Sequence, residues 1–403
     1  MECRYCKGTK LIKFLDLGQQ ALANDYAKNG MMGQYHLPLK VAFCEKCGLV
    51  QVIDYEAPEN IFNEEYKYYS SYSTSWLNHC EKYVDMIVKR NNLTSASNII
   101  EIASNDGYLL QYFKKYNIDP LGIEPSASVA EIARSKGIKT DINFFTKEYA
   151  IKNIKQKADL IIGNNVLAHV PDIRNFVAGL KIALEKNGTI TLEFPSLMEM
   201  LKNNYFDTIY HEHFSYLSLY FLKRLFENEG LKVYDVELLH THGGSLRIYV
   251  THFENSIKVQ KSVEKLLQHE YEYGIADKMT YIRFGEHAKQ TKYEIVKALL
   301  EIKQKGKRIV GYGAAAKGNT LFNYVGIDAD YIDYVVDKSP YKQGSYLPGS
   351  LIEICNIDRI KQDKPDYIII IPWNLKKEIE KELDFVKEWG TKFITLLPEI
   401  VVW

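Results

Sequence analysis

Two pairs of cysteines near the start of the chain place the strongest constraint on its fold. Cys3 and Cys6 form one C-x-x-C pair, and Cys44 and Cys47 form a second after a 37-residue spacer. Two tight knuckles supply four thiolates in the tetrahedral arrangement that a structural zinc ion needs, whereas the alternative is four free buried thiols. Four protein ligands leave no position for a catalytic water, so we expect the zinc to serve folding. The long spacer predicts that the segment between the knuckles has a structure of its own.

The rest of the sequence predicts an α/β fold in several domains. Its 403 residues exceed what one hydrophobic core usually serves. Residues 1–70 have frequent turns and no helical periodicity, which is typical of a small unit held by a metal. Residues 71–252 begin with an expected amphipathic helix at 76–87, and short apolar strands then alternate with helical stretches. This pattern predicts a doubly wound parallel sheet of the Rossmann type. We expect its strands at residues 98–102, 120–124, 158–162 and 189–193.

A second alternation of strands and helices follows a charged stretch at residues 256–304, where we expect one or two connecting helices. It predicts a C-terminal Rossmann-like α/β domain. The expected domains are a zinc-binding domain at 1–70, a central Rossmann-like domain at 71–252 and the C-terminal domain at 253–403. We expect the strands of the C-terminal domain at residues 307–311, 331–337, 367–371 and 391–396.

The charge balance and the hydropathy of the chain bear on its partners and location. Lys plus Arg and Asp plus Glu number 51 each, so no overall field attracts nucleic acid or an acidic membrane. The first residues lack the pattern of a signal peptide, and no apolar run reaches the length that a bilayer requires. We therefore expect a cytoplasmic protein, without nucleic-acid or membrane partners, that acts as a monomer.

A turn of small residues after the first predicted strand is the candidate cofactor site. The segment from Glu101 to Gly107 joins this strand to an expected helix at 108–113, where open α/β sheets bind cofactors. Glu124 closes the next strand and can accept hydrogen bonds from both hydroxyls of a ribose. Asn164 follows a third strand and would face the same crevice. These residues favour an adenosine-containing cofactor without separating S-adenosylmethionine from NAD, and a turn that merely connects strand to helix is the alternative.

A segment rich in histidine is the candidate for proton transfer. Residues 210–216 hold five ionisable or phenolic side chains in seven positions, beginning Tyr210-His211-Glu212-His213. A histidine can take a proton near neutral pH, and a tyrosine or second histidine can stabilise a developing oxyanion. Carbon methylation needs this pairing, because the enzyme must make a carbon nucleophile beside a carbonyl group. The alternatives are a metal pair at His211 and His213 or an ordinary surface loop.

The C-terminal domain carries a second glycine loop that supports other functions. Gly311, Gly313 and Ala316 follow a predicted strand, and Asp337 ends the next strand, as in a dinucleotide-binding fingerprint. An NAD-dependent sugar-nucleotide oxidoreductase is therefore the main alternative to a methyltransferase. A non-catalytic sugar-nucleotide-binding protein would also keep the glycine loops but would not need His213. A zinc-ribbon RNA methyltransferase is disfavoured, because the N-terminal unit has only scattered Lys and Arg.

Six motifs together resemble the sugar C-methyltransferases of antibiotic deoxysugar pathways, in the family's order and over nearly the whole chain. The resemblance implies a zinc-binding domain, an S-adenosylmethionine domain and a C-terminal α/β domain that helps to hold the nucleotide sugar. It also implies a dTDP-linked or GDP-linked keto-deoxysugar as substrate, typically methylated at C-3 and in some members at C-5. The motifs are the paired cysteines and residues 101–107, 206–213, 242–247, 311–320 and 372–375.

The same resemblance implies roles for individual residues. His213 would be the general base that removes the proton next to the ketone, and Glu212 would orient or assist it. Tyr210, His169 and one tyrosine of the 66–71 segment would contact the sugar and its enolate. Of that segment, Tyr68 is the first choice and Tyr66 the second.

The resemblance further implies two sets of binding residues. Ala103 stands where general class I methyltransferases commonly have glycine, which bears on how tightly the loop holds the methionyl group. The expected S-adenosylmethionine contacts are Glu101, Ala103, Ser104, Asn105, Asp106, Gly107, Glu124, Pro125 and Asn164. The expected substrate contacts are Tyr66, Ser71, His242, Gly244, Ser245, Lys317, Asn319 and Asn374.

Overall fold

The computed structural model describes residues 1–27, 35–53, 57 and 69–403. An antiparallel sheet in the order β1-β2-β3-β9 follows the first cysteine knuckle. Strands β1 and β2 pair within the spacer between the knuckles, which confirms that this spacer has a structure of its own. The last strand comes from far along the chain, so the sheet joins the N-terminal unit to the segment after the histidines. Its strands are β1 (Leu11–Ala21), β2 (His36–Cys44), β3 (Val50–Val52) and β9 (Ser215–Tyr216).

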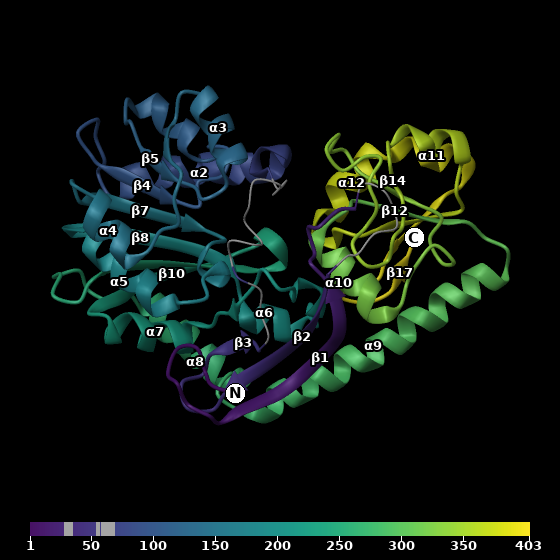
Figure 1. Ribbon diagram of the computed structural model, residues 1–403, viewed down its shortest axis with the longest axis horizontal. Coiled ribbons are helices and arrows are strands. Elements are labelled where there is room, and N and C mark those ends of the chain that lie inside the picture. The colour runs from purple at the N-terminus through teal and green to yellow at the C-terminus, as the bar shows by residue number, and fades with distance from the viewer. Residues whose placement is uncertain (28–34, 54–56, 58–68) are drawn as a thin grey trace.

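The central sheet has the order β10-β11-β8-β7-β4-β5-β6 (Figure 1). The strands from β8 to β6 run parallel, as predicted, whereas β11 and β10 form an antiparallel edge that the sequence did not predict. The chain passes from β4 to β5 and β6 on one side and then crosses to β7 on the other. Ligands of open α/β sheets bind beside such a reversal. The strands are β4 (Ile99–Ile102), β5 (Leu121–Ile123), β6 (Lys139–Asp141), β7 (Ala158–Asn164), β8 (Leu184–Pro195), β10 (Leu231–Leu239) and β11 (Ser245–His252).

Helices cover both faces of the central sheet. Ile99 belongs to one core with the apolar face of α2, and its neighbour Ile100 belongs to another with α5, because alternate residues of a strand face opposite sides. Helix α2 confirms the amphipathic helix predicted at 76–87. The helix predicted at 108–113 is instead a 3-10 helix, η2 (Leu110–Tyr116). The α-helices are α2 (Thr74–Arg90), α3 (Ala127–Ser135), α4 (Lys147–Asn153), α5 (Ile173–Ala183), α6 (Leu197–Lys202) and α7 (Leu219–Asn228).

The C-terminal sheet has the order β14-β13-β12-β15-β16-β17 and is parallel except for β17. It confirms the predicted second α/β unit. The sequence did not predict β14 and β17, and of the strand expected at 331–337 only β13 forms. The elements are β12 (Ile309–Tyr312), α10 (Ala316–Val325), β13 (Val335–Val336), β14 (Ile354–Cys355), α11 (Asp358–Asp363), β15 (Tyr367–Ile370), α12 (Lys376–Glu382), β16 (Lys392–Thr395) and β17 (Val401–Val402).

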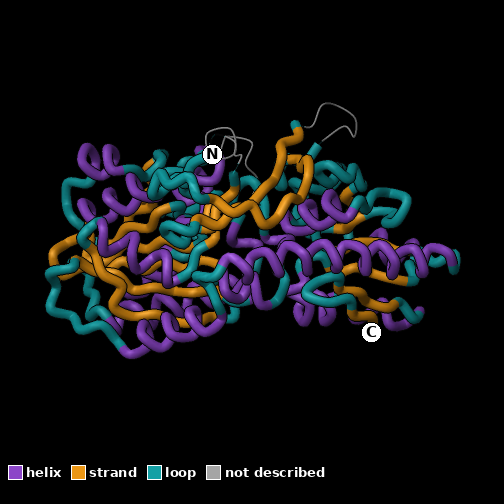
Figure 2. Tube along the Cα trace, turned by 90° about the horizontal axis from the view of Figure 1, so that it is seen from below, coloured by secondary structure: helices purple, strands orange, loops and turns teal. Residues whose placement is uncertain are grey.

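Two helices, α8 (Lys261–Tyr273) and α9 (Lys278–Gln304), connect the central and C-terminal sheets. The 27 residues of α9 span about 40 Å, and Figures 1 and 2 show this helix passing beside β1 to the C-terminal domain. Gly285 lets α9 approach β1 closely, because a Cβ atom there would lie 1.9 Å from the carbonyl oxygen of Phe14. Among the described residues, no helix is long and apolar enough to cross a membrane.

Candidate active site

The four N-terminal cysteines meet in one cluster. Their Sγ atoms all lie within 4.8 Å of one another, with 3.5 Å between Cys3 and Cys47 and 3.6 Å between Cys6 and Cys44. A tetrahedral zinc ion with its usual bond lengths separates its sulfur ligands by about 3.8 Å, so the cluster fits zinc. Within the described part of the chain, this is the one group of three or more His, Cys, Asp or Glu residues with the geometry of a metal site.

The first cysteine knuckle is tied directly to the histidine segment. Arg4, which lies between the first two zinc ligands, donates to the carbonyl oxygens of Val52, at 2.6 Å, and of Phe214. It also donates to the Ser215 hydroxyl at 3.2 Å. Since Phe214 follows His213, the zinc-binding unit holds the segment that contains the candidate base.

A cavity of about 710 Å³ lies between the central and C-terminal sheets. Its walls include the ends of β4, β5 and β7 on one side and the turn after β12 on the other. We call residues 101–107 the central loop and residues 311–317 the C-terminal loop. The predicted site residues that line the cavity are Ala103, Asn105, Glu124, Pro125, Asn164, His169, Tyr210, Glu212, His213, His242, Lys317 and Asn374.

Glu124 is held by the backbone at the central side of the cavity. Its two carboxylate oxygens accept hydrogen bonds from the backbone N–H groups of Asn105, at 3.0 Å, and Ser126, at 2.9 Å. Burial raises the pKa of Glu124 to about 7, and these two donors oppose the shift. Each oxygen keeps a further lone pair, so the carboxylate can still accept hydrogen bonds from a ligand.

The histidine segment fixes one tautomer of His213. Its Nδ1 atom lies 2.8 Å from the carbonyl oxygen of Thr208, which can only accept, so Nδ1 carries the proton and Nε2 keeps a lone pair in the neutral ring. Burial, with a contribution from His169, holds the pKa of His213 well below its usual value. The neutral ring is therefore the resting form at pH 7, with a basic nitrogen available.

Two further side chains surround His213 in the cavity. The His169 ring stands edge-on with its centroid 4.7 Å from that of His213, and burial lowers its pKa to about 4. The Tyr210 ring lies 4.0 Å from the His213 ring. The structure thus brings together three residues that the sequence selected for proton transfer and oxyanion stabilisation.

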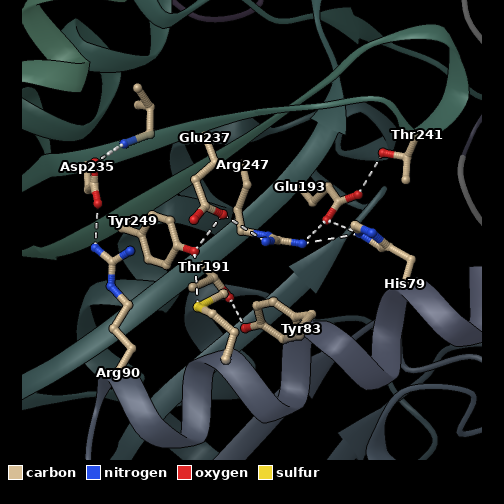
Figure 3. Close-up of polar contacts among 12 residues, drawn as sticks. His79, Tyr83, Arg90, Thr191, Glu193, Asp235, Glu237, Thr241, Arg247 and Tyr249 are labelled. Carbon is tan, nitrogen blue, oxygen red and sulfur yellow. Dashed lines mark hydrogen bonds and ion pairs between the residues drawn. The ribbon is translucent and has the colours of Figure 1, made fainter.

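A buried network of charged side chains lies next to the part of the cavity wall that contains His242 (Figure 3). Glu193 at its centre accepts from Arg247 at 2.7 Å, from His79 at 2.9 Å and from the Thr241 hydroxyl at 3.0 Å. Burial alone would raise the pKa of Glu193, but His79 and Arg247 bring it below its usual value. Arg247 also pairs with Glu237 at 2.9 Å, so the guanidinium spans two carboxylates.

This network holds the part of the wall that contains His242. Thr241 precedes His242, whose ring lies 5.2 Å from that of Trp76, and Trp76 stacks on His79 at 5.1 Å. Burial lowers the pKa of His242 to about 4, so the ring is neutral at physiological pH. The backbone at His242 is left-handed, with φ +54°, and its neighbours hold it in this conformation.

The C-terminal side of the cavity is cationic. The Lys317 ammonium donates to the Asn374 side-chain oxygen at 2.8 Å and lies 4.3 Å from the centre of the Trp373 ring. Burial lowers its pKa, and the nearby Asp207 carboxylate opposes this shift. Helix α10 begins at this loop without a side-chain cap, and its first residues, Ala316 and Lys317, line the cavity. Asp337 accepts from the backbone of Ala314 at 2.7 Å.

Comparison with known proteins identifies this arrangement of domains. Three family models match in order: a putative zinc binding domain at residues 3–62, a methyltransferase domain at 77–236 and a C-methyltransferase C-terminal domain at 240–398. The chain is also 33% identical over 403 residues to the C-methyltransferase NovU of Streptomyces niveus, covering 99% of this chain and 96% of that protein. The chain belongs to the C-methyltransferase family. It is an S-adenosylmethionine-dependent C-methyltransferase with a zinc site formed by its four N-terminal cysteines.

Solved methyltransferases match less than half of this C-methyltransferase, at low similarity. The magnesium protoporphyrin IX methyltransferase of Synechocystis, solved with S-adenosylmethionine, has 13% identity and a TM-score of 0.34, covering 44% of this chain and 79% of that one. An S-adenosylmethionine-dependent methyltransferase of Clostridium acetobutylicum has 11% identity and a TM-score of 0.36, covering 44% and 92%.

Some predicted contacts of the C-methyltransferase do not line the cavity. The Ser245 hydroxyl donates to the Thr241 carbonyl at 3.0 Å, and the Asn319 amide donates to the Ala23 carbonyl at 2.7 Å, so both side chains have partners inside the protein. Tyr66 and Tyr68 lie outside the described residues, and their roles stay predictions. The predicted contacts away from the cavity wall are Glu101, Ser104, Asp106, Gly107, Ser71, Gly244, Ser245 and Asn319.

Sequence reasoning missed several residues of the cavity wall. Asn24 comes from the N-terminal unit, and its contact with Glu212 has no signal in local sequence. The loop after β6 and the start of α5 could have been found, because both leave the same edge of the central sheet as Glu124. These missed residues include Asn24, Ser70, Ser73, Trp76, Asn143, Phe144, Thr146, Asn165, Asp172, Asn175 and Lys342.

Proposed function

We propose that this C-methyltransferase methylates C-3 of a nucleotide-linked 4-keto-deoxysugar carrying dTDP or GDP. A base removes the proton from the carbon next to the ketone, and the resulting enolate carbon attacks the methyl group. The methyltransferase and C-methyltransferase domain matches support transfer to carbon. The family resemblance and the cavity between two α/β domains support the sugar nucleotide as acceptor. We also propose that the enzyme is cytoplasmic and monomeric.

The hydrogen bond between His213 Nδ1 and the Thr208 carbonyl is the observation that carries this mechanism. It leaves Nε2 as the atom that takes the proton. The C–H bond breaks, its electron pair enters the enolate, and His213 becomes an imidazolium. Tyr210 lines the same cavity and is proposed to donate a hydrogen bond to the enolate oxygen, whereas His169, whose one N–H is directed to the Glu212 carbonyl, is proposed to contact the sugar.

Residues of the central loop and of the neighbouring strand ends fit the cofactor. S-adenosylmethionine supplies an electrophilic methyl group when it is bound. Glu124 is proposed to accept hydrogen bonds from the ribose hydroxyls, since its oxygens keep lone pairs on the cavity side. Asn105 and Asn164 add polar groups at the ends of β4 and β7, the strands that flank the reversal of the sheet.

Residues of the C-terminal loop fit the diphosphate of the substrate. Lys317 supplies a positive charge, and the uncapped start of α10 supplies backbone donors, the two features that bind phosphate groups at helix N-termini. A dinucleotide could use the same features, but the family assignment favours methyl transfer over the NAD-dependent alternative. Titration calorimetry tests this choice: S-adenosylhomocysteine should bind, and binding of NAD in its place would reject the proposal.

Replacing the proposed base tests the mechanism. His213→Asn should abolish solvent deuterium exchange at the sugar carbon next to the ketone and lower methyl transfer about 1,000-fold, while S-adenosylhomocysteine affinity stays unchanged. The matched control is His287→Asn, which changes an exposed histidine on α9. Exchange at the wild-type rate in His213→Asn would reject His213 as the base. A wild-type protein that binds sugar nucleotides but neither exchanges nor methylates them would fit the non-catalytic alternative.

A further inference from the structure

A segment of the N-terminal unit reaches the active-site cavity. Residues 22–27 follow β1, and Figure 1 shows the purple chain leaving the end of β1 beside α10. Asn24 in this segment lines the cavity together with Glu212, although 188 positions separate the two residues in sequence. The zinc-binding unit therefore supplies part of the active-site wall.

Hydrogen bonds hold the chain to the C-terminal domain on both sides of Asn24. The carbonyl oxygen of Ala23 accepts a hydrogen bond from the Asn319 amide at 2.7 Å. On the other side, the Tyr26 hydroxyl donates to the Ala314 carbonyl at 2.6 Å, and the Ala27 carbonyl accepts from the backbone of Tyr346 at 2.9 Å. These contacts fix the backbone on either side of Asn24, so its side chain is held in place before any ligand binds.

The Asn24 side chain makes a direct contact with Glu212. Its Nδ2 atom donates to Glu212 Oε1 at 2.6 Å, and the Glu212 side chain is almost fully buried, with 3% of the residue exposed. A hydrogen bond to a buried carboxylate both orients it and favours its ionised form. We propose that Asn24 is a positioning residue that holds the Glu212 carboxylate in the cavity for the proton transfer, an inference that rests on the proposed function.

The charges around Glu212 explain why this contact matters. Burial raises the pKa of Glu212 to about 7, and the Asn24 amide opposes the shift. The other titratable groups around it are Tyr26, His169, which donates to the Glu212 backbone carbonyl, and His213. Burial keeps both histidines neutral near pH 7, so neither titrates there. An ionised Glu212 in the same cavity stabilises the imidazolium that forms on His213.

The test compares pH profiles of kcat for the zinc-loaded, full-length protein at saturating S-adenosylmethionine. Saturation keeps Glu124, which titrates in the same range, from contributing. Asn24→Leu removes the donor at nearly constant size. It should move the acidic limb of the profile upward by about one pH unit and lower kcat at pH 7 about fivefold. The affinity for S-adenosylhomocysteine should not change.

Two further variants keep the result interpretable. Asn24→Asp puts two carboxyl groups in contact, so they should lose their protons in two coupled steps and the single acidic limb should split or broaden. Tyr26→Phe removes a neighbouring anchor of the segment but no donor to Glu212, and should leave the limb where it is. An unmoved limb in Asn24→Leu, an unchanged profile in Asn24→Asp, or an equal shift in Tyr26→Phe would overturn the role of Asn24. A wild-type protein that methylates no keto-sugar nucleotide would instead reject the proposed function.

Discussion

The central loop and the C-terminal loop occupy equivalent positions in two sheets, but only the C-terminal loop presents a charged side chain, Lys317, to the cavity. Each follows a parallel strand, and in each case an acid at the end of the neighbouring strand accepts a hydrogen bond from the loop backbone. Glu124 accepts from Asn105 in the first sheet, and Asp337 accepts from Ala314 in the second. Similar topology therefore produces similar backbone geometry around two different binding surfaces.

The difference lies in what each loop adds to that geometry. Both sides have an acid at the end of a strand, Glu124 or Asp337, but the described lysines that line the cavity, Lys317 and Lys342, both come from the C-terminal domain. An α-helix starts directly at the C-terminal loop, but only the 3-10 helix η2 follows the central loop. A carboxylate suits ribose hydroxyls and a cationic sulfonium, and an ammonium with helix N–H groups suits a diphosphate. We infer that the shared fold is used twice for ligands of opposite charge.

The largest expected effect is the loss of the cation on the C-terminal side. Lys317→Met keeps the length of the side chain but removes its charge, so the KM for the nucleotide sugar should rise about 100-fold. Calorimetry should find S-adenosylhomocysteine affinity unchanged. The exposed Lys338 provides the control, since Lys338→Met should alter neither quantity. An equal loss of cofactor affinity in Lys317→Met would contradict the assignment of the cofactor to the central side and the nucleotide sugar to the C-terminal side.

The second largest expected effect concerns the backbone of the C-terminal loop. Gly313 has φ +92°, and a Cβ atom there would lie 2.6 Å from Cδ of Pro372, so Gly313→Ala should destabilise the protein by about 2 kcal/mol. Thermal unfolding measures the change. Gly306→Ala is the control, because Gly306 has a similar φ of +68° but open space around it. A smaller loss in Gly313→Ala than in Gly306→Ala would contradict the close contact.

Glu124, the acid that accepts a hydrogen bond from the central loop, should give a smaller, pH-dependent effect. Glu124→Gln should weaken S-adenosylhomocysteine binding about tenfold at pH 8. Because the pKa of Glu124 in the free protein is about 7, wild-type affinity should fall as the pH drops from 8 to 6, and the variant should lose this dependence. Glu270→Gln serves as control, since Glu270 has a similar pKa but caps α7 outside the cavity. A variant that keeps the wild-type pH dependence would exclude Glu124 as its source.

The smallest expected effect concerns strain in the central loop. Ala103 has φ +56°, a left-handed conformation that glycine adopts without strain. Ala103→Gly should therefore stabilise the protein by about 0.5 kcal/mol, after the extra flexibility that glycine gives the unfolded chain is subtracted. Thermal unfolding would again show the sign, opposite to that of Gly313→Ala. Destabilisation in Ala103→Gly would mean that the methyl group of Ala103 packs favourably.

The sequence predicted those features that appear as a repeated pattern or as a cluster of residues along the chain. The spacing of the cysteines predicted the metal cluster, and the apolar strands predicted both α/β sheets. Strand ends located Glu124 and Asn164 at the cavity, because parallel strands of one sheet end at a common edge, and the family resemblance located Lys317 there.

Side-chain direction and long-range contacts could not be predicted in the same way. Ser245 and Asn319 belong to motifs near the cavity, yet their side chains turn to carbonyl groups inside the protein. Asn24 reaches Glu212 only because the N-terminal unit packs between distant parts of the chain. Such contacts depend on how folded domains pack against one another, and local sequence propensity carries no information about that packing.

The fourth strand of the N-terminal sheet sets an order for folding during synthesis. β3 pairs with β9, so the sheet cannot be completed until Tyr216, beyond the midpoint of the chain, has left the ribosome. Until then β3 presents an open edge, and open edges invite pairing with other chains. The N-terminal sheet, although made first, can therefore be completed only after the middle of the chain has been synthesised. A fragment that ends before β9 would expose the edge of β3, which would be prone to aggregation.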